Sequence, residues 1–144
     1  MTTINSFNSG LGIYSLLVGF AYIIVGCAQI ITGIIRIESP IVPGDFFQGA
    51  VLIIIGLVFV MGFVDMRKGE SDWVAYLTIG SLLAGIIFVL YVFMILSNGL
   101  GWALGFEDWL EWTPLEQFQP GLWLFVFALP GIYLVSKKYR STKD

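Results

Sequence analysis

Polar side chains are rare in the long apolar stretches of this sequence, and Gln29 and Thr32 stand out among them. They lie three residues apart in the first apolar stretch, so a helix would place them on one face. An amide and a hydroxyl in that arrangement could line a solute path or form an intramembrane polar site. The alternative for Gln29 is an interhelical hydrogen bond, which contributes about 0.6 kcal/mol inside a membrane. We expect this structural role to be the main one.

The densest charge in the sequence is a cluster of carboxylates after the third apolar stretch: Glu107, Asp108, Glu111 and Glu116. Such a cluster could bind a cation or dock a basic partner, although its spacing does not match a calcium-binding loop. The simpler interpretation is the solvated face of a helix that lies at the membrane interface. The outer partner-binding residues that we predict, as the alternative to this solvated face, are Glu107, Asp108, Trp109, Glu111 and Trp112.

Much chemistry is excluded by composition. The sequence has no histidine, which removes histidine-ligated haem and copper sites, most zinc sites and the most common general base. Cys27 is the single cysteine, so no Cys-x-x-Cys motif can exchange disulfides. No carboxylate lies in the middle of an apolar stretch, where a proton-coupled pump would need one. We therefore predict a protein that is not an enzyme and has no catalytic residues, metal or cofactor.

The elements that must position these residues are long apolar helices. The chain is 58% hydrophobic and only 12% charged, whereas about a quarter of the residues of a soluble domain are charged. About 20 apolar residues cross a bilayer as a helix. Residues 11–35, 46–64 and 73–96 satisfy this rule, and residues 120–137 form a shorter fourth candidate. We predict an all-α integral membrane four-helix bundle, forming a single transmembrane domain over residues 1–144.

The connections between these spans predict two antiparallel helical hairpins. Pro43 and Gly44 suit the central positions of a type II turn, in which the second residue has a positive φ. Asp45 is a predicted N-cap of the second span, with Gln48 completing a capping box. Residues 97–119 form the outer interfacial segment. It begins with a glycine-rich exit from the membrane and continues as a two-turn amphipathic helix over residues 106–112.

Glycines recur at every seventh position of the first span. From Gly12 to Gly33 they cover about 31 Å, the thickness of the hydrocarbon core, and form one slowly turning stripe. Small residues let membrane helices approach closely, so this stripe predicts a groove for another helix. The second span is the default occupant, and a partner subunit, a second copy, or a lipid or quinone tail are alternatives. The predicted helix-packing residues are Gly12, Gly19, Gly26, Gly33, Gly49 and Gly56.

The first two spans also align with each other at an offset of 30 residues, which pairs Gly19 with Gly49 and Gly26 with Gly56. Duplication and chance convergence both explain this alignment. The basic residues other than Arg36 fall in the connection after the second span and in the C-terminal tail. The positive-inside rule then predicts a multi-pass protein of the cell membrane with both termini in the cytoplasm.

The functional prediction follows from the absent chemistry and the glycine groove. We expect a small, non-catalytic structural or accessory subunit of a larger membrane complex. A small oligomeric channel or transporter, with Gln29 and Thr32 near its path, is the alternative. The expected partners are membrane lipid and either other membrane subunits or further copies of the chain, and we expect no binding to nucleic acid.

Overall fold

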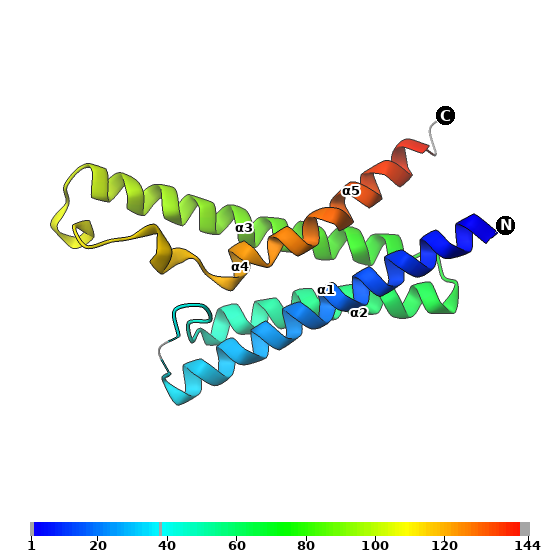
Figure 1. Ribbon diagram of the computed structural model, residues 1–144, viewed down its shortest axis with the longest axis horizontal. Coiled ribbons are helices and arrows are strands. Elements are labelled where there is room, and N and C mark those ends of the chain that lie inside the picture. The colour runs from blue at the N-terminus through cyan, green and yellow to red at the C-terminus, as the bar shows by residue number, and fades with distance from the viewer. Residues whose placement is uncertain (1, 38, 142–144) are drawn as a thin grey trace.

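The computed structural model describes residues 2–37 and 39–141, and every regular element within these ranges is a helix. Three long helices are followed by short helical turns and a shorter final helix (Figure 1). The elements in order are α1 (Thr2–Ile35), α2 (Phe46–Lys68), α3 (Trp73–Ala103), η1 (Glu107–Trp109), η2 (Pro114–Gln117), α4 (Pro120–Trp123) and α5 (Phe125–Ser141). The two η elements are 3₁₀ helices.

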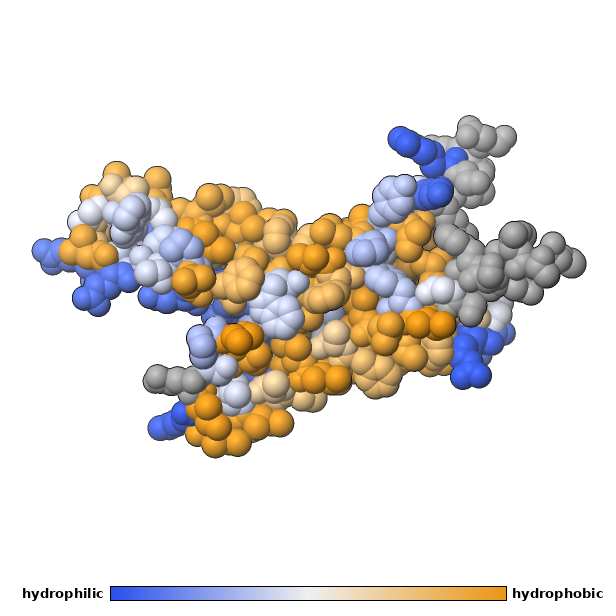
Figure 2. Space-filling view, in the orientation of Figure 1, coloured by the Kyte–Doolittle hydropathy of each residue, from blue (hydrophilic) through white to orange (hydrophobic). Residues whose placement is uncertain are grey.

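Three helical segments are long and apolar enough to span a membrane: Gly10–Ile35, Phe46–Lys68 and Trp73–Ala103. A shorter apolar helical stretch covers Pro120–Leu134. Figure 2 shows apolar side chains over the middle of the molecule and hydrophilic residues gathered at its ends. This is the distribution expected of a protein whose middle lies in hydrocarbon. The predicted all-α membrane fold class is confirmed.

The long helices form antiparallel neighbours. In Figure 1, α2 returns along α1, α3 runs back from the end of α2, and α4 and α5 return along α3. The start of α1 and the end of α5 therefore lie at one end of the molecule (Figure 1). We call it the basic end because α2 ends there with Arg67 and Lys68, and Lys137 belongs to the last turns of α5. The opposite end holds the connection between α1 and α2 and the carboxylates of Glu107 and Asp108, and we call it the acidic end.

The start of α2 confirms one sequence prediction and overturns two. Asp45 is the N-cap, and its Oδ1 accepts a hydrogen bond from the Gln48 backbone N–H at 2.9 Å. The predicted capping box is wrong, because the Gln48 side chain binds Gln29 instead. The predicted type II turn is also wrong, because Gly44 does not have a positive φ. A Cβ on Gly44 would lie 2.5 Å from the Gly33 Cα, so close approach of the backbones is what requires glycine there.

The segment that follows α3 differs from the expected one. α3 continues to Ala103 instead of ending at residue 96, so the glycine-rich exit is helical. Tertiary packing overrides the weak helix propensity there, because aromatic rings from the following segment cover Gly99 and Gly101. The two-turn amphipathic helix is not formed, and the 3₁₀ helix η1 and a turn take its place. A helix of two turns is marginal on its own because nucleation is unfavourable.

The core lies between α1, α2 and α3 at mid-height. Its most enclosed large side chains include Tyr22, Leu52, Ile55, Phe59 and Leu77. Burial is uneven between the helices. Within the most apolar 18-residue stretch of each helix, 39% of the stretch is buried in α1 and 33% in α2, against 17% in α3. The third helix is therefore the least covered of the three by the rest of the chain.

Candidate functional site

The glycines of α1 lie against the backbone of α2. A Cβ on Gly26 would lie 2.6 Å from the carbonyl oxygen of Gly49, and a Cβ on Gly49 would lie 2.6 Å from that of Gly26. Gly19 and Gly56 form a second reciprocal pair, with distances of 2.9 and 2.6 Å. These separations leave no room for any side chain, so only glycine permits this approach.

The same stripe continues to both ends of the hairpin. Near the basic end, a Cβ on Gly12 would lie 3.0 Å from the Met66 Sδ and 3.4 Å from the Phe63 ring. Near the acidic end, Gly33 lies against the backbone of Gly44. Along the hairpin, the helix that occupies the glycine groove of α1 is therefore α2.

The contacts in this interface repeat with two-fold pseudosymmetry. A Cβ on Gly19 would contact Gly56 and Val60. Gly49 lies 30 positions after Gly19, and Ile30 lies 30 positions before Val60; these two residues meet in the same manner. Gly26 likewise meets Gly49 and Ile53, whereas Gly56 meets Gly19 and Ile23. The offset of 30 residues in the sequence is thus also the relation between the two sides of the packed hairpin.

A buried pair of amides, Gln29 and Gln48, lies between α1 and α2 near the acidic end. Gln29 is 0% exposed and Gln48 is 8% exposed. The Nε2 of Gln29 donates to the Oε1 of Gln48 at 2.9 Å, with a second, longer contact of 3.4 Å to the Pro43 carbonyl. Thr32 does not join this pair, because its hydroxyl binds the Ala28 carbonyl of its own helix at 2.9 Å.

The amide pair uses only half of its hydrogen-bonding capacity. Gln29 Oε1 and Gln48 Nε2 are buried and have no hydrogen-bond partner among the residues that the structure describes. An unpaired buried amide is costly, at about 1–3 kcal/mol for each group. Sequence reasoning missed Gln48 as a site residue because its position after Asp45 suggested a capping role.

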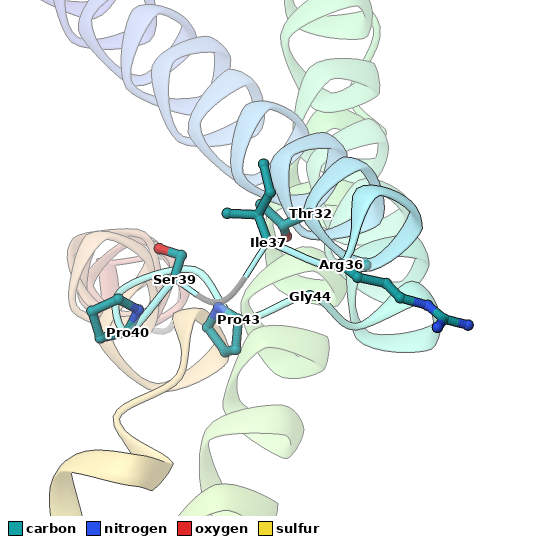
Figure 3. Close-up of a pocket in the computed structure, with 8 residues that line it drawn as sticks. Thr32, Arg36, Ile37, Ser39, Pro40, Pro43 and Gly44 are labelled. Carbon is teal, nitrogen blue, oxygen red and sulfur yellow. The ribbon is translucent and has the colours of Figure 1, made fainter.

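Two hollows lie toward the acidic end of the hairpin. One, of about 640 Å³, lies beneath the connection between α1 and α2 and is lined by residues that include Thr32, Arg36, Ser39, Pro43 and Gly44. Figure 3 shows the Arg36 side chain pointing away from this connection, so its charge does not enter the hollow. The other, of about 230 Å³, lies between α2 and α3 and includes Gln48 in its lining.

Tyr14 links α1 to the last helix. Its hydroxyl donates to the Phe127 carbonyl at 2.6 Å and accepts from the Gly131 backbone N–H at 2.9 Å. In a regular helix that N–H would donate to that carbonyl, so the hydroxyl binds both groups of one ladder bond, next to Pro130. A Cβ on Gly131 would lie 3.1 Å from this hydroxyl, which explains the small residue. Pro130 was the only signal in the sequence for such a contact.

The predicted outer surface separates into two parts. The Trp109 ring packs on Gly101, and its Nε1 donates to Asn98 at 3.1 Å. A Cβ on Gly99 would lie 3.6 Å from the Trp112 ring. Both tryptophans are thus half-buried against α3, whereas the acidic residues remain exposed: Glu107, Asp108 and Glu111. Within the described ranges, no group of three or more histidine, cysteine, aspartate or glutamate residues could hold a metal ion.

Comparisons with known proteins agree with this architecture. A family model described as the MJ0565 integral membrane domain matches residues 5–138. The uncharacterised protein MJ0565 of Methanocaldococcus jannaschii is 31% identical over 102 residues, which cover 71% of this chain and 58% of the relative. The chain thus aligns with less than two thirds of that relative's length. No solved structure matches the chain.

Proposed function

We propose a non-catalytic role for this chain, which belongs to the MJ0565 integral membrane domain family. It would act as a small structural or accessory subunit that packs against other membrane helices in a larger complex. The observation that carries the proposal is the uncovered apolar surface of α3. Its most apolar 18-residue stretch is 17% buried, against 39% and 33% for those of α1 and α2.

The geometry of α3 supports a partner at this surface. Its 31 residues span about 46 Å, well beyond the roughly 30 Å of a hydrocarbon core. The glycine stripe of α1, by contrast, is already occupied by α2. Large apolar side chains lie exposed along one face of α3: Leu82, Ile86, Val89 and Phe93. Membrane helices associate by packing such faces together.

The placement of charge supports one orientation. Arg67, Lys68 and Lys137 lie at the basic end, where α1 begins and α5 ends. The positive-inside rule assigns that end to the cytoplasm, and the acidic end to the outer side of the cell membrane. The exposed carboxylates near η1 would then face outward, where a basic segment of a partner could bind them.

Native mass spectrometry of the protein extracted in mild detergent, through a tag after the C-terminal residue, tests the proposal. We expect different subunits at fixed stoichiometry. Ile86→Trp on α3 should dissociate them, whereas Ile24→Trp on α1 should not. The two isoleucines are matched in exposure, at 56% and 64%. A monomer, or an assembly unaffected by Ile86→Trp, would contradict the proposal.

A second candidate function is a small oligomeric channel or transporter. The Gln29 amide, which contacts the carbonyl of Pro43 in the lining of the hollow beneath the α1–α2 connection, favours it. Against it, Tyr22, Leu52 and Ile55 fill the core at mid-height and are at most 1% exposed. Ion or solute flux into liposomes that is lost in Gln29→Leu would support this function, and a homo-oligomer without foreign chains would make that assay decisive.

A further inference from the structure

We propose that α5 has a hinge next to Pro130, that its terminal arm, residues 131–141, takes two positions, and that Tyr14 selects between them. In one position the Tyr14 hydroxyl is inserted into the hydrogen-bond ladder of α5, as the structure shows. In the other, this hydroxyl bonds to Ser81 and the ladder closes. Three features support the hinge: the inserted hydroxyl, an unpaired hydroxyl beside it, and the uneven anchoring of α5.

The hydrogen-bond ladder of α5 is altered at two successive positions. Pro130 has no N–H, so the Val126 carbonyl lacks its donor four residues on. One position later, the Tyr14 hydroxyl donates to the Phe127 carbonyl at 2.6 Å and accepts from the Gly131 N–H at 2.9 Å. Helices bend where a proline or an inserted side chain interrupts the ladder. Both causes coincide here, so this is where α5 bends most easily.

An alternative partner for the hydroxyl lies beside it. Ser81 of α3 is 2% exposed, and its Oγ has no hydrogen-bond partner among the residues that the structure describes. A Cβ on Gly131 would lie 3.1 Å from the Ser81 Oγ and 3.1 Å from the Tyr14 hydroxyl, so the two oxygens border the same space. The glycine leaves that space open. A rotation of the Tyr14 side chain that carries its hydroxyl across this space reaches Ser81.

The two arrangements contain the same number of hydrogen bonds. In the observed one, Tyr14 bonds to the Phe127 carbonyl and to the Gly131 N–H, and Ser81 has no partner. In the alternative one, the Gly131 N–H donates to the Phe127 carbonyl, and Tyr14 and Ser81 bond to each other. No buried group loses its last partner in the exchange, which avoids the main cost of moving polar groups inside a protein. Two states of such similar energy are both populated.

The two halves of α5 are anchored very differently. Before the hinge, Ala128 is 0% exposed and the Phe125 ring stacks on Phe88 with their centroids 4.6 Å apart. Beyond the hinge, Tyr133 is 66% exposed, and Figure 1 shows the last turns of α5 diverging from α3. A segment with few buried contacts moves at little cost. The first half of α5 is therefore fixed, and the terminal arm is free to change direction.

The arm forms part of the wall of a hollow of about 530 Å³ between α3 and α5. Ile132 of the arm lines this hollow, and so do Leu82 and Ile86 of α3. The position of the arm therefore sets the width of the hollow beside the face of α3 that would meet a partner subunit. This effect on a partner rests on the proposed function, whereas the two positions of the arm do not.

The test is a distance measurement by pulsed electron paramagnetic resonance on the full chain in liposomes. Nitroxide labels are placed at Arg140→Cys in the arm and at Lys68→Cys at the end of α2, with Cys27→Ala to remove the native thiol. A change of about 20° in helix direction moves residue 140, about 14 Å beyond the hinge, by about 5 Å. We expect two distances that differ by about 5 Å.

Two conservative variants should each retain one of these distances. Ser81→Ala removes the alternative partner, so only the distance of the observed arrangement should remain. Tyr14→Phe removes the inserted hydroxyl, so the ladder closes and only the other distance should remain. Equal distances in the two variants, or a single distance in the chain that carries the labels alone, would overturn the proposal.

Controls separate the hinge from a general loosening of the fold. Labels at Lys68→Cys and Val126→Cys, on the fixed half of α5, should give one distance in every variant. Tyr133→Phe and Ser97→Ala remove exposed hydroxyls from α5 and α3 and should keep both distances of the arm. A shift at Val126 as large as that at residue 140 would also overturn the proposal, because α5 would then move as a whole. None of these outcomes depends on the subunit composition of a complex.

Discussion

At the centre of the α1–α2 hairpin the paired glycines lie against backbone, whereas on α3 the glycines lie against aromatic side chains. Gly26 and Gly49 would each place a Cβ 2.6 Å from the other's carbonyl oxygen. Gly101 would place a Cβ 3.1 Å from the Trp109 ring. Both arrangements bring elements close together at small residues, but the atoms they meet differ in their freedom to move.

The difference bears on what each half can do. A carbonyl within a helix cannot move without shifting the helix, so the hairpin has one permitted packing. An aromatic ring can tilt about its side-chain bonds, so the half containing α3, α4 and α5 can adapt. The adaptable half also contains α3, the least buried of the three long helices. We infer that the hairpin provides the rigid framework, and that α3 provides the surface that accommodates a partner.

The strongest test of this comparison is Gly26→Ala. The new methyl would meet the Gly49 carbonyl at 2.6 Å and the Ile53 side chain at 2.9 Å, so α1 and α2 would have to separate. Overpacking of this kind costs about 3 kcal/mol when backbone must move. We expect that loss in the free energy of unfolding, measured by denaturant titration in mixed micelles.

The matched control is Gly10→Ala in the same helix. A Cβ at Gly10 has nothing within 4 Å, so alanine should leave stability unchanged or raise it by about 0.5–1 kcal/mol through helix propensity. Equal effects of the two substitutions would show that the glycine stripe is incidental to the packing.

A smaller effect is expected for Tyr14→Phe, which removes the hydroxyl that joins the two halves. The Phe127 carbonyl and the Gly131 N–H would lose their shared partner, at a cost of about 1 kcal/mol in the same titration. Tyr133→Phe is the control, because Tyr133 is 66% exposed and its hydroxyl makes no hydrogen bond within the described residues. Similar losses in both variants would mean that the hydroxyl does not connect the halves.

The sequence was most informative about features that depend on the residues of a single helix. Long apolar stretches predicted the positions of the helices because the bilayer sets their length. Asp45 was predicted as an N-cap because its hydrogen bond to Gln48 spans three residues. The spacing of Gly12, Gly19, Gly26 and Gly33 marked one face of α1, which in the structure lies against α2.

Prediction failed where distant segments meet. The Gln29–Gln48 bond and the Tyr14 bridge to α5 depend on how helices are placed in three dimensions, which no local pattern specifies. The extension of α3 beyond residue 96 has the same origin. Gly99 and Gly101 read as helix breakers, but aromatic rings from the next segment pack on them and stabilise the helix.

The smallest effect is expected for Gly101→Ala, which tests whether the α3 half is less rigid than the hairpin. Its Cβ would lie 3.1 Å from the Trp109 ring, and a tilt of the ring by a few tenths of an ångström relieves the contact. The tilt would weaken the indole hydrogen bond to Asn98, so we expect a loss below about 1 kcal/mol. Gly85→Ala, at an ordinary 3.6 Å from Phe125, is the neutral control. A loss for Gly101→Ala as large as that for Gly26→Ala would show that Asn98 holds the ring as firmly as backbone. The α3 half would then be as rigid as the hairpin, and adaptability could not explain its uncovered surface.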